Sequence, residues 1–267
     1  AASTGGQIMP PIMGAAAFLM ADFIGVPYSS ILGRAVLPAI LYFAGIFITV
    51  HLEAKRLGLS GIPKEQLPKF GFLVRKIYLL VPLVMLVVWV SGNYMTMQRA
   101  ASFAIVLAIV VSLFDKDNRI TPAKFFDALE AGGKSTITVA AACGVAGIIS
   151  GSITMTGLAN ELINGIIAVS NNHLIIALFL TMICCIVLGM GVPTTANYCI
   201  MAATCAPILI RMGVPALAAH FFVFYFGIVA DITPPVALAA YAGSAIAKAN
   251  PMKTAFNASR LAIAVFI

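Results

Sequence analysis

Continuous apolar runs dominate the chain. They cover residues 35–51, 77–94, 98–114 and 136–156, and an α-helix that crosses a bilayer needs about 20 such residues. A β-barrel would show segments of about ten residues with alternating polarity. Because only helices and closed barrels satisfy their backbone groups in lipid, the pattern predicts an all-α polytopic membrane protein.

Two further apolar segments each contain a Pro-Pro pair. The pairs lie at 10–11 within residues 1–24 and at 234–235 within residues 217–247. Proline lacks a backbone N–H and costs about 3 kcal/mol in a helix interior, so each pair predicts a broken helix. We expect Thr233 to cap the second half of the later helix, because threonine is a good N-cap and proline fits the first helical position.

Residues 173–210 hold two short apolar arms that meet at a Gly-Met-Gly-Val-Pro break. Since each arm is shorter than the about 20 residues of a crossing, we expect a re-entrant hairpin with its tip near the membrane midplane. Gly189 and Gly191 allow the backbone to turn there. Neutral oxygens at the tip, which suit a sodium-like ion better than a transition metal, come from Thr194, Thr195 and Asn197.

Composition supports a membrane location. The 267 residues are 61% hydrophobic and 9% charged, whereas soluble domains carry about 25% charged residues. The net charge of +7 comes from basic residues in short loops, which indicates membrane topology and not a nucleic-acid surface. If 173–210 is a hairpin, then 13 of the 16 basic residues lie on one side, in loops 52–76, 115–135 and 248–260. We expect that side to be cytoplasmic, with His51 and His220 near the membrane surfaces.

With this topology the two Pro-Pro helices run in opposite directions. Inverted repeats of broken helices around a midplane site are typical of secondary transporters. Four parts are expected: 1–27 as the end of a first repeat, 28–172 as connecting helices, 173–250 as a second repeat (hairpin 173–211, broken helix 217–247), and 251–267 as the start of a truncated last helix. We therefore expect the chain to be a portion of a longer membrane protein.

Three stretches resemble one transporter family. They are "ASTGGQIMPPIMGAAAFLMADFIGVPY", "GMGVPTTANY" and "APILIRMGVPALAAHFFVFYFGIVADITPPVALAAYA", which are similar to the large membrane subunit of tripartite ATP-independent periplasmic (TRAP) transporters, and among them to the fused TAXI-type permeases. The resemblance implies an elevator-type importer of organic acids in the bacterial inner membrane, driven by an ion gradient. It also implies a periplasmic substrate-binding protein and a small membrane subunit or fused N-terminal helices as partners.

The resemblance further implies two sites for a coupling ion, Na⁺ or H⁺, and no other metal or cofactor. The candidate ion ligands are Gly6, Met9, Pro11, Gly189, Val192, Thr194, Ala230 and Thr233. The candidate substrate-binding residues are the polar residues beside the same breaks: Ser3, Thr4, Thr195, Asn197 and Asp231.

Asp231 leaves three interpretations open. A carboxylate at membrane depth is costly and is by default a functional candidate. It is a counter-charge for sodium, a proton-binding group in a proton-coupled variant, or a carboxylate satisfied by a nearby arginine or by backbone donors.

Two other function classes fit the sequence less well. An intramembrane enzyme would need a His/Cys/Asp cluster or a Ser-His pair, and the spans contain neither. A channel or a structural subunit would not need inverted broken helices, although channels also use re-entrant hairpins. The stretch "EAGGKST" (130–136) lacks the preceding strand of a phosphate-binding loop, so we expect it to end a cytoplasmic loop.

Overall fold

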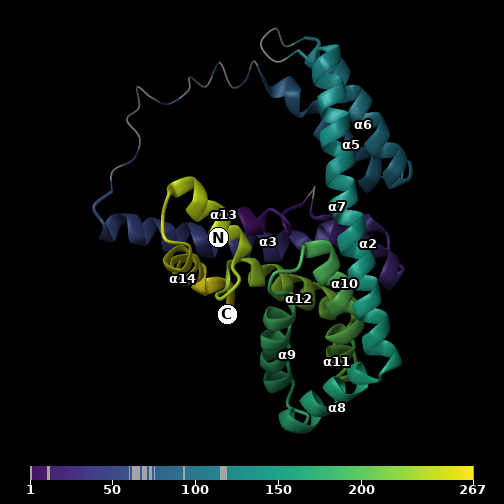
Figure 1. Cartoon of the computed structure of the whole chain (residues 1–267), viewed down its shortest axis with the longest axis vertical. Coiled ribbons are helices and arrows are strands. Elements are labelled where there is room, and N and C mark those ends of the chain that lie inside the picture. The colour runs from purple at the N-terminus through teal and green to yellow at the C-terminus, as the bar shows by residue number, and fades with distance from the viewer. Residues whose placement is uncertain are drawn as a thin grey trace.

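The computed structural model describes residues 2–10, 13–59, 61, 67, 71, 74, 76–92, 94–114 and 119–266. Over these residues the chain forms helices and no strand, so the predicted all-α fold is confirmed (Figure 1). The candidate ion ligand Pro11 lies outside the described part, as do four basic residues of the predicted loops 52–76 and 115–135: Lys64, Lys69, Arg75 and Lys116.

The first Pro-Pro pair separates two helices. Helix α1 (Ala2–Gly5) ends before it, and α2 (Ala15–Ile24) begins after it, with Gly14 as the residue preceding the helix. Helix α3 (Tyr28–Arg56) is longer at both ends than the predicted span 35–51, and it contains Pro38.

Helix α3 is the one described helix that is long and apolar enough to cross a bilayer by itself. The bent pair Gly147–Ile153 and Leu158–Ser170, which turns by 66°, would be a second span if it acts as one. The other apolar helices are shorter, including those in the predicted spans 77–94 and 98–114: η2 (Ile77–Leu80), α5 (Val81–Ser91) and α6 (Met97–Ser112).

Helix α7 (Pro122–Met155) contradicts the predicted loop 115–135. The helix begins near Thr121, whose Oγ1 accepts a hydrogen bond from the Lys124 N–H at 3.4 Å, and proline is favoured in the first turn. An exposed ion pair one turn apart, Glu130–Lys134 at 2.5 Å, adds a few tenths of a kcal/mol (~0.3–0.5). The two glycines of "EAGGKST" cost about 2 kcal/mol in a helix, more than these local interactions supply, and packing of the same helix along α10 (Thr194–Thr204) adds stability. Lys134 therefore lies on a helix and not in a loop.

The rest of the chain includes residues 173–211, predicted to form a hairpin, and residues 217–247, predicted to form the second broken helix. The elements are α8 (Leu158–Ser170), α9 (Leu174–Gly189), α10 (Thr194–Thr204), α11 (Ala206–Arg211), α12 (Ala216–Val229), η3 (Ala230–Ile232), α13 (Leu238–Ala247), α14 (Pro251–Leu261) and η4 (Ile263–Phe266). The second arm is itself interrupted at Cys205, before Pro207. Helix α9 lies beside α11, and α7 packs along α10 (Figure 1).

The largest buried cluster joins both broken helices. It contains Ile8 and Met20 from the first, Tyr42 from α3, and Phe224 and Ile232 from the second. Both breaks therefore border one core, although they are far apart in sequence.

Candidate ion-binding site

The hairpin tip packs closely against the end of α12. Gly189 is the last residue of α9, and a Cβ atom there would lie 2.7 Å from Asn197 Nδ2, 3.0 Å from Ala230 Cβ and 3.1 Å from the Gly227 carbonyl oxygen. Only glycine permits this approach. Gly191 then turns the chain with φ +77°, a conformation that glycine adopts without strain.

Asn197 fastens the second arm of the hairpin to the broken helix. Its Nδ2 donates a hydrogen bond to the Gly227 carbonyl at 2.9 Å, and the residue is 2% exposed. Its Oδ1 is buried and has no hydrogen-bond partner among the described residues. Such an oxygen costs about 1–3 kcal/mol unless a ligand satisfies it. The adjoining cavity, which Thr194 and Gly227 also line, is too small for a water molecule.

The predicted N-cap at Thr233 is wrong. Thr233 is extended (φ −103°, ψ 125°), and α13 begins only at Leu238. Residues that precede a proline are disfavoured in the helical region, and both Thr233 and Pro234 precede one. Thr233 instead closes α12, because its Oγ1 donates to the Val229 carbonyl at 2.8 Å and its N–H donates to the Ala230 carbonyl at 3.1 Å.

The first break, between α1 and α2, also has buried polar side-chain atoms beside it. Thr4 is buried and Ser3 is exposed. The side-chain oxygens of Thr4 and Gln7 are buried without a hydrogen-bond partner in the described part of the chain. The Met9 carbonyl accepts from the Met13 N–H at 3.3 Å. Each break thus borders a buried side-chain oxygen that no described group satisfies. Gln7 was not among the predicted site residues.

Asp231 lies half-buried in η3, at the break itself. It is close enough to act electrostatically on Tyr42 of α3. No lysine or arginine of the described residues forms an ion pair with it, so the described structure gives no support to an arginine partner.

The candidate residues fall into separate groups. Gly189, Asn197 and Ala230 meet at the hairpin tip, and Thr194 lines the same cavity as Asn197. Val192 packs against Ala196 and Ile200 instead. Of the remaining candidates, half-buried Thr195 shows no side-chain hydrogen bond among the described residues, and exposed Gly6 donates its backbone N–H to the Ser3 carbonyl at 3.2 Å.

A buried Tyr198–His220 pair was not anticipated. The Tyr198 hydroxyl lies 2.7 Å from His220 Nδ1, and the Tyr198 ring stacks on Phe23 of α2 and meets Phe224 edge-on. His220 was expected near a membrane surface, and the structure buries it in the protein, 8% exposed, because Tyr198 supplies its hydrogen bond. No local sequence signal links two residues 22 positions apart.

Removing the Tyr198 hydroxyl is expected to destabilise the hairpin. Tyr198→Phe keeps the ring contacts but leaves His220 Nδ1 without its partner, at a cost of about 1–3 kcal/mol. The apparent melting temperature of the purified protein should fall. Tyr94→Phe, at a residue that is 74% exposed, is the matched control and should change nothing. Equal melting temperatures for both variants would contradict the pair's structural role.

Comparison with known proteins identifies the family. A family model described as "Tripartite ATP-independent periplasmic transporter, DctM component" matches residues 1–266. No curated protein matches the chain. The match covers both broken helices and the hairpin between them. The chain therefore belongs to the DctM component family of tripartite ATP-independent periplasmic transporters.

Proposed function

We propose that this chain couples the inward movement of sodium to the uptake of a small carboxylate. The DctM family consists of membrane components of secondary transporters that work with a periplasmic binding protein and a small membrane subunit, and it is not an enzyme family. The observation that carries the proposal is how the two side-chain amide atoms of Asn197 are placed. Its nitrogen Nδ2 joins the 173–211 segment to α12 through the Gly227 carbonyl, and its buried Oδ1 has no hydrogen-bond partner among the described residues.

Neutral oxygens around this amide favour a hard monovalent cation. Gly189 lies close to the Asn197 amide, the Gly227 carbonyl accepts a hydrogen bond from that amide, and a carbonyl oxygen can accept more than one interaction. Oxygen ligands without charge suit sodium better than a transition metal. The first break is the proposed second ion site, because the described part of the chain supplies no hydrogen-bond partner for its buried Thr4 and Gln7 side-chain oxygens.

The carboxylate proposal rests on helix N-termini. Helix α10 begins at Thr194, and α13 begins at Leu238 beyond the second break. The N-terminal end of a helix carries partial positive charge and free N–H groups, which suit an anion. In this proposal 1–27 and 173–250 form inverted repeats, 173–211 is re-entrant, and both move together as an elevator in the bacterial inner membrane.

Proton coupling through Asp231 is the second candidate. It is favoured by a half-buried carboxylate at the break that has no basic ion-pair partner among the described residues. Its chemistry differs from the sodium proposal, because the coupling ion would bind a side chain that changes charge.

Uptake by the complete transporter with its binding protein separates the two candidates. We expect uptake to follow an imposed sodium gradient and to survive Asp231→Asn, since neutral oxygens remain. Asp22→Asn, at an exposed residue of α2, is the matched control. Uptake that needs only a pH gradient and is lost in Asp231→Asn would overturn sodium coupling in favour of the proton.

A further inference from the structure

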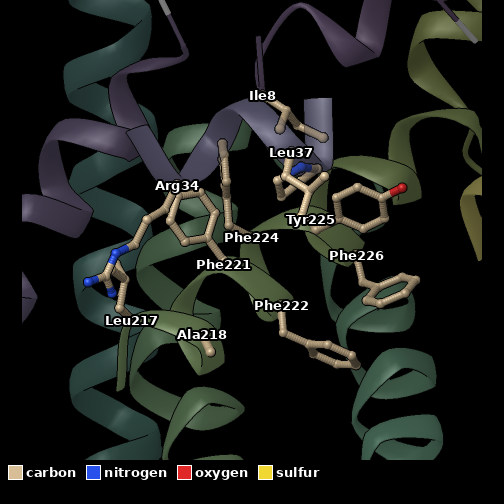
Figure 2. A pocket seen from close by; sticks show the side chains of 11 residues that line it. Ile8, Arg34, Leu37, Leu217, Ala218, Phe221, Phe222, Phe224, Tyr225 and Phe226 are labelled. Atoms are coloured by element: carbon tan, nitrogen blue, oxygen red, sulfur yellow. The ribbon is translucent and has the colours of Figure 1, made fainter. Parts of the chain in front are cut away.

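An apolar groove lies between α3 and α12, and Figure 2 shows its lining. Leu37 and Pro38 line it from α3, and aromatic side chains of α12, including Phe221 and Phe226, line it from the other side. Its volume is about 430 Å³. Among the described residues that line it, Arg34 is the one with a charge.

The groove begins near the N-terminal ends of α3 and α12 and extends along α12. Arg34 and Leu217 lie together at one end, whereas Phe226 lies toward the other (Figure 2). Both end residues are close to the first residue of their helices, Tyr28 and Ala216. At 1.5 Å per residue, Leu217 to Phe226 spans about 14 Å. This is close to half of the about 30 Å hydrocarbon core, so the groove matches one leaflet.

The end of the groove at Arg34 offers both hydrogen-bond donors and a hydrogen-bond acceptor. Arg34 is exposed and forms no ion pair with a carboxylate among the described residues. Its guanidinium can bind phosphate through two parallel hydrogen bonds. Pro38 lacks an N–H, so the Arg34 carbonyl cannot receive the usual hydrogen bond from four residues later.

We propose that the groove binds a phosphatidylglycerol molecule of the surrounding leaflet. One acyl chain lies along the aromatic floor, the phosphate binds the Arg34 guanidinium, and a headgroup hydroxyl donates to the Arg34 carbonyl. A transmembrane helix of a partner is the alternative occupant. Its backbone groups are paired within the helix, so it would offer the Arg34 guanidinium an anionic acceptor only through an acidic side chain.

Native mass spectrometry of the complete transporter tests this binding. After incubation with phosphatidylglycerol or phosphatidylcholine, the wild type should retain the first lipid and not the second. Arg34→Gln should lower retention of phosphatidylglycerol about tenfold or more, because it removes charge-assisted hydrogen bonds. Arg99→Gln, an exposed arginine on α6 outside the groove, is the matched control.

A second variant tests the apolar floor with Arg34 intact. Ala218 lines the groove and is exposed, so Ala218→Trp fills the space without disturbing the core and should displace the lipid. Ala108→Trp, at an exposed site on α6, is its control. Unchanged retention in both groove variants would overturn the proposal. So would loss of the small membrane subunit from these variants with lipid retention intact, because a protein would then occupy the groove.

Discussion

Asn197→Ala is expected to lower sodium-driven uptake by the complete transporter about tenfold or more and to raise the sodium concentration for half-maximal uptake. The substitution removes the buried Oδ1, the proposed ion ligand, and the donor to the Gly227 carbonyl. An unpaired buried carbonyl costs about 1–3 kcal/mol, and 1.4 kcal/mol corresponds to a factor of ten. A sodium titration of uptake at saturating substrate measures both changes.

Two companion variants distinguish ion binding from a structural role. Asn257→Ala removes an exposed amide on α14 and should leave the titration unchanged. Asn197→Asp loses the donor to Gly227 but keeps an oxygen ligand, so its uptake should still depend on sodium. If all three variants kept the wild-type sodium dependence, Asn197 would not be an ion ligand.

Gly189→Ala is expected to have the second large effect. Its new Cβ atom would lie 2.7 Å from Asn197 Nδ2, which is shorter than Cβ contacts in proteins. It would also lie too close to Ala230 Cβ and the Gly227 carbonyl oxygen. Overpacking of this kind costs about 1–3 kcal/mol. It should separate the hairpin tip from α12 and abolish uptake, with a lower melting temperature.

Gly165→Ala on α8 provides the contrast. A Cβ atom at Gly165 meets nothing within 4 Å. Because alanine forms helices better than glycine by about 1 kcal/mol, this variant should be as stable as the wild type or slightly more stable. A Gly189→Ala transporter as active and stable as Gly165→Ala would contradict the close packing of the tip.

Local chemistry made the breaks predictable. The pairs at 10–11 and 234–235 lack backbone N–H groups wherever the chain goes, so no tertiary contact can restore those helical hydrogen bonds. The end of α9 at Gly189 likewise follows from the Gly-Met-Gly-Val-Pro stretch. The all-α fold was therefore accessible from the sequence.

The partners across the site were not predictable in this way. Asn197 bonds to Gly227, 30 residues away, and no periodicity of apolar residues encodes which amide meets which carbonyl. Thr233 looked like an N-cap by residue type, but whether its hydroxyl turns forward or back depends on the geometry of the prolines that follow. The prediction of a loop where α7 begins was wrong for a related reason, because charges and glycines are as compatible with an exposed helix as with a loop.

The hydroxyl of Thr233 also bears on how quickly an ion could be exchanged. By holding the end of α12 with its own hydrogen bond, Thr233 keeps the break ordered before anything binds. The backbone entropy of the break is then lost when the protein folds. Ordering the break therefore does not weaken the binding free energy of each ion. In the proposed sodium site, the break itself would not have to become ordered when an ion binds, and the closed cavity beside Asn197 is the part that must open for the ion to enter and leave.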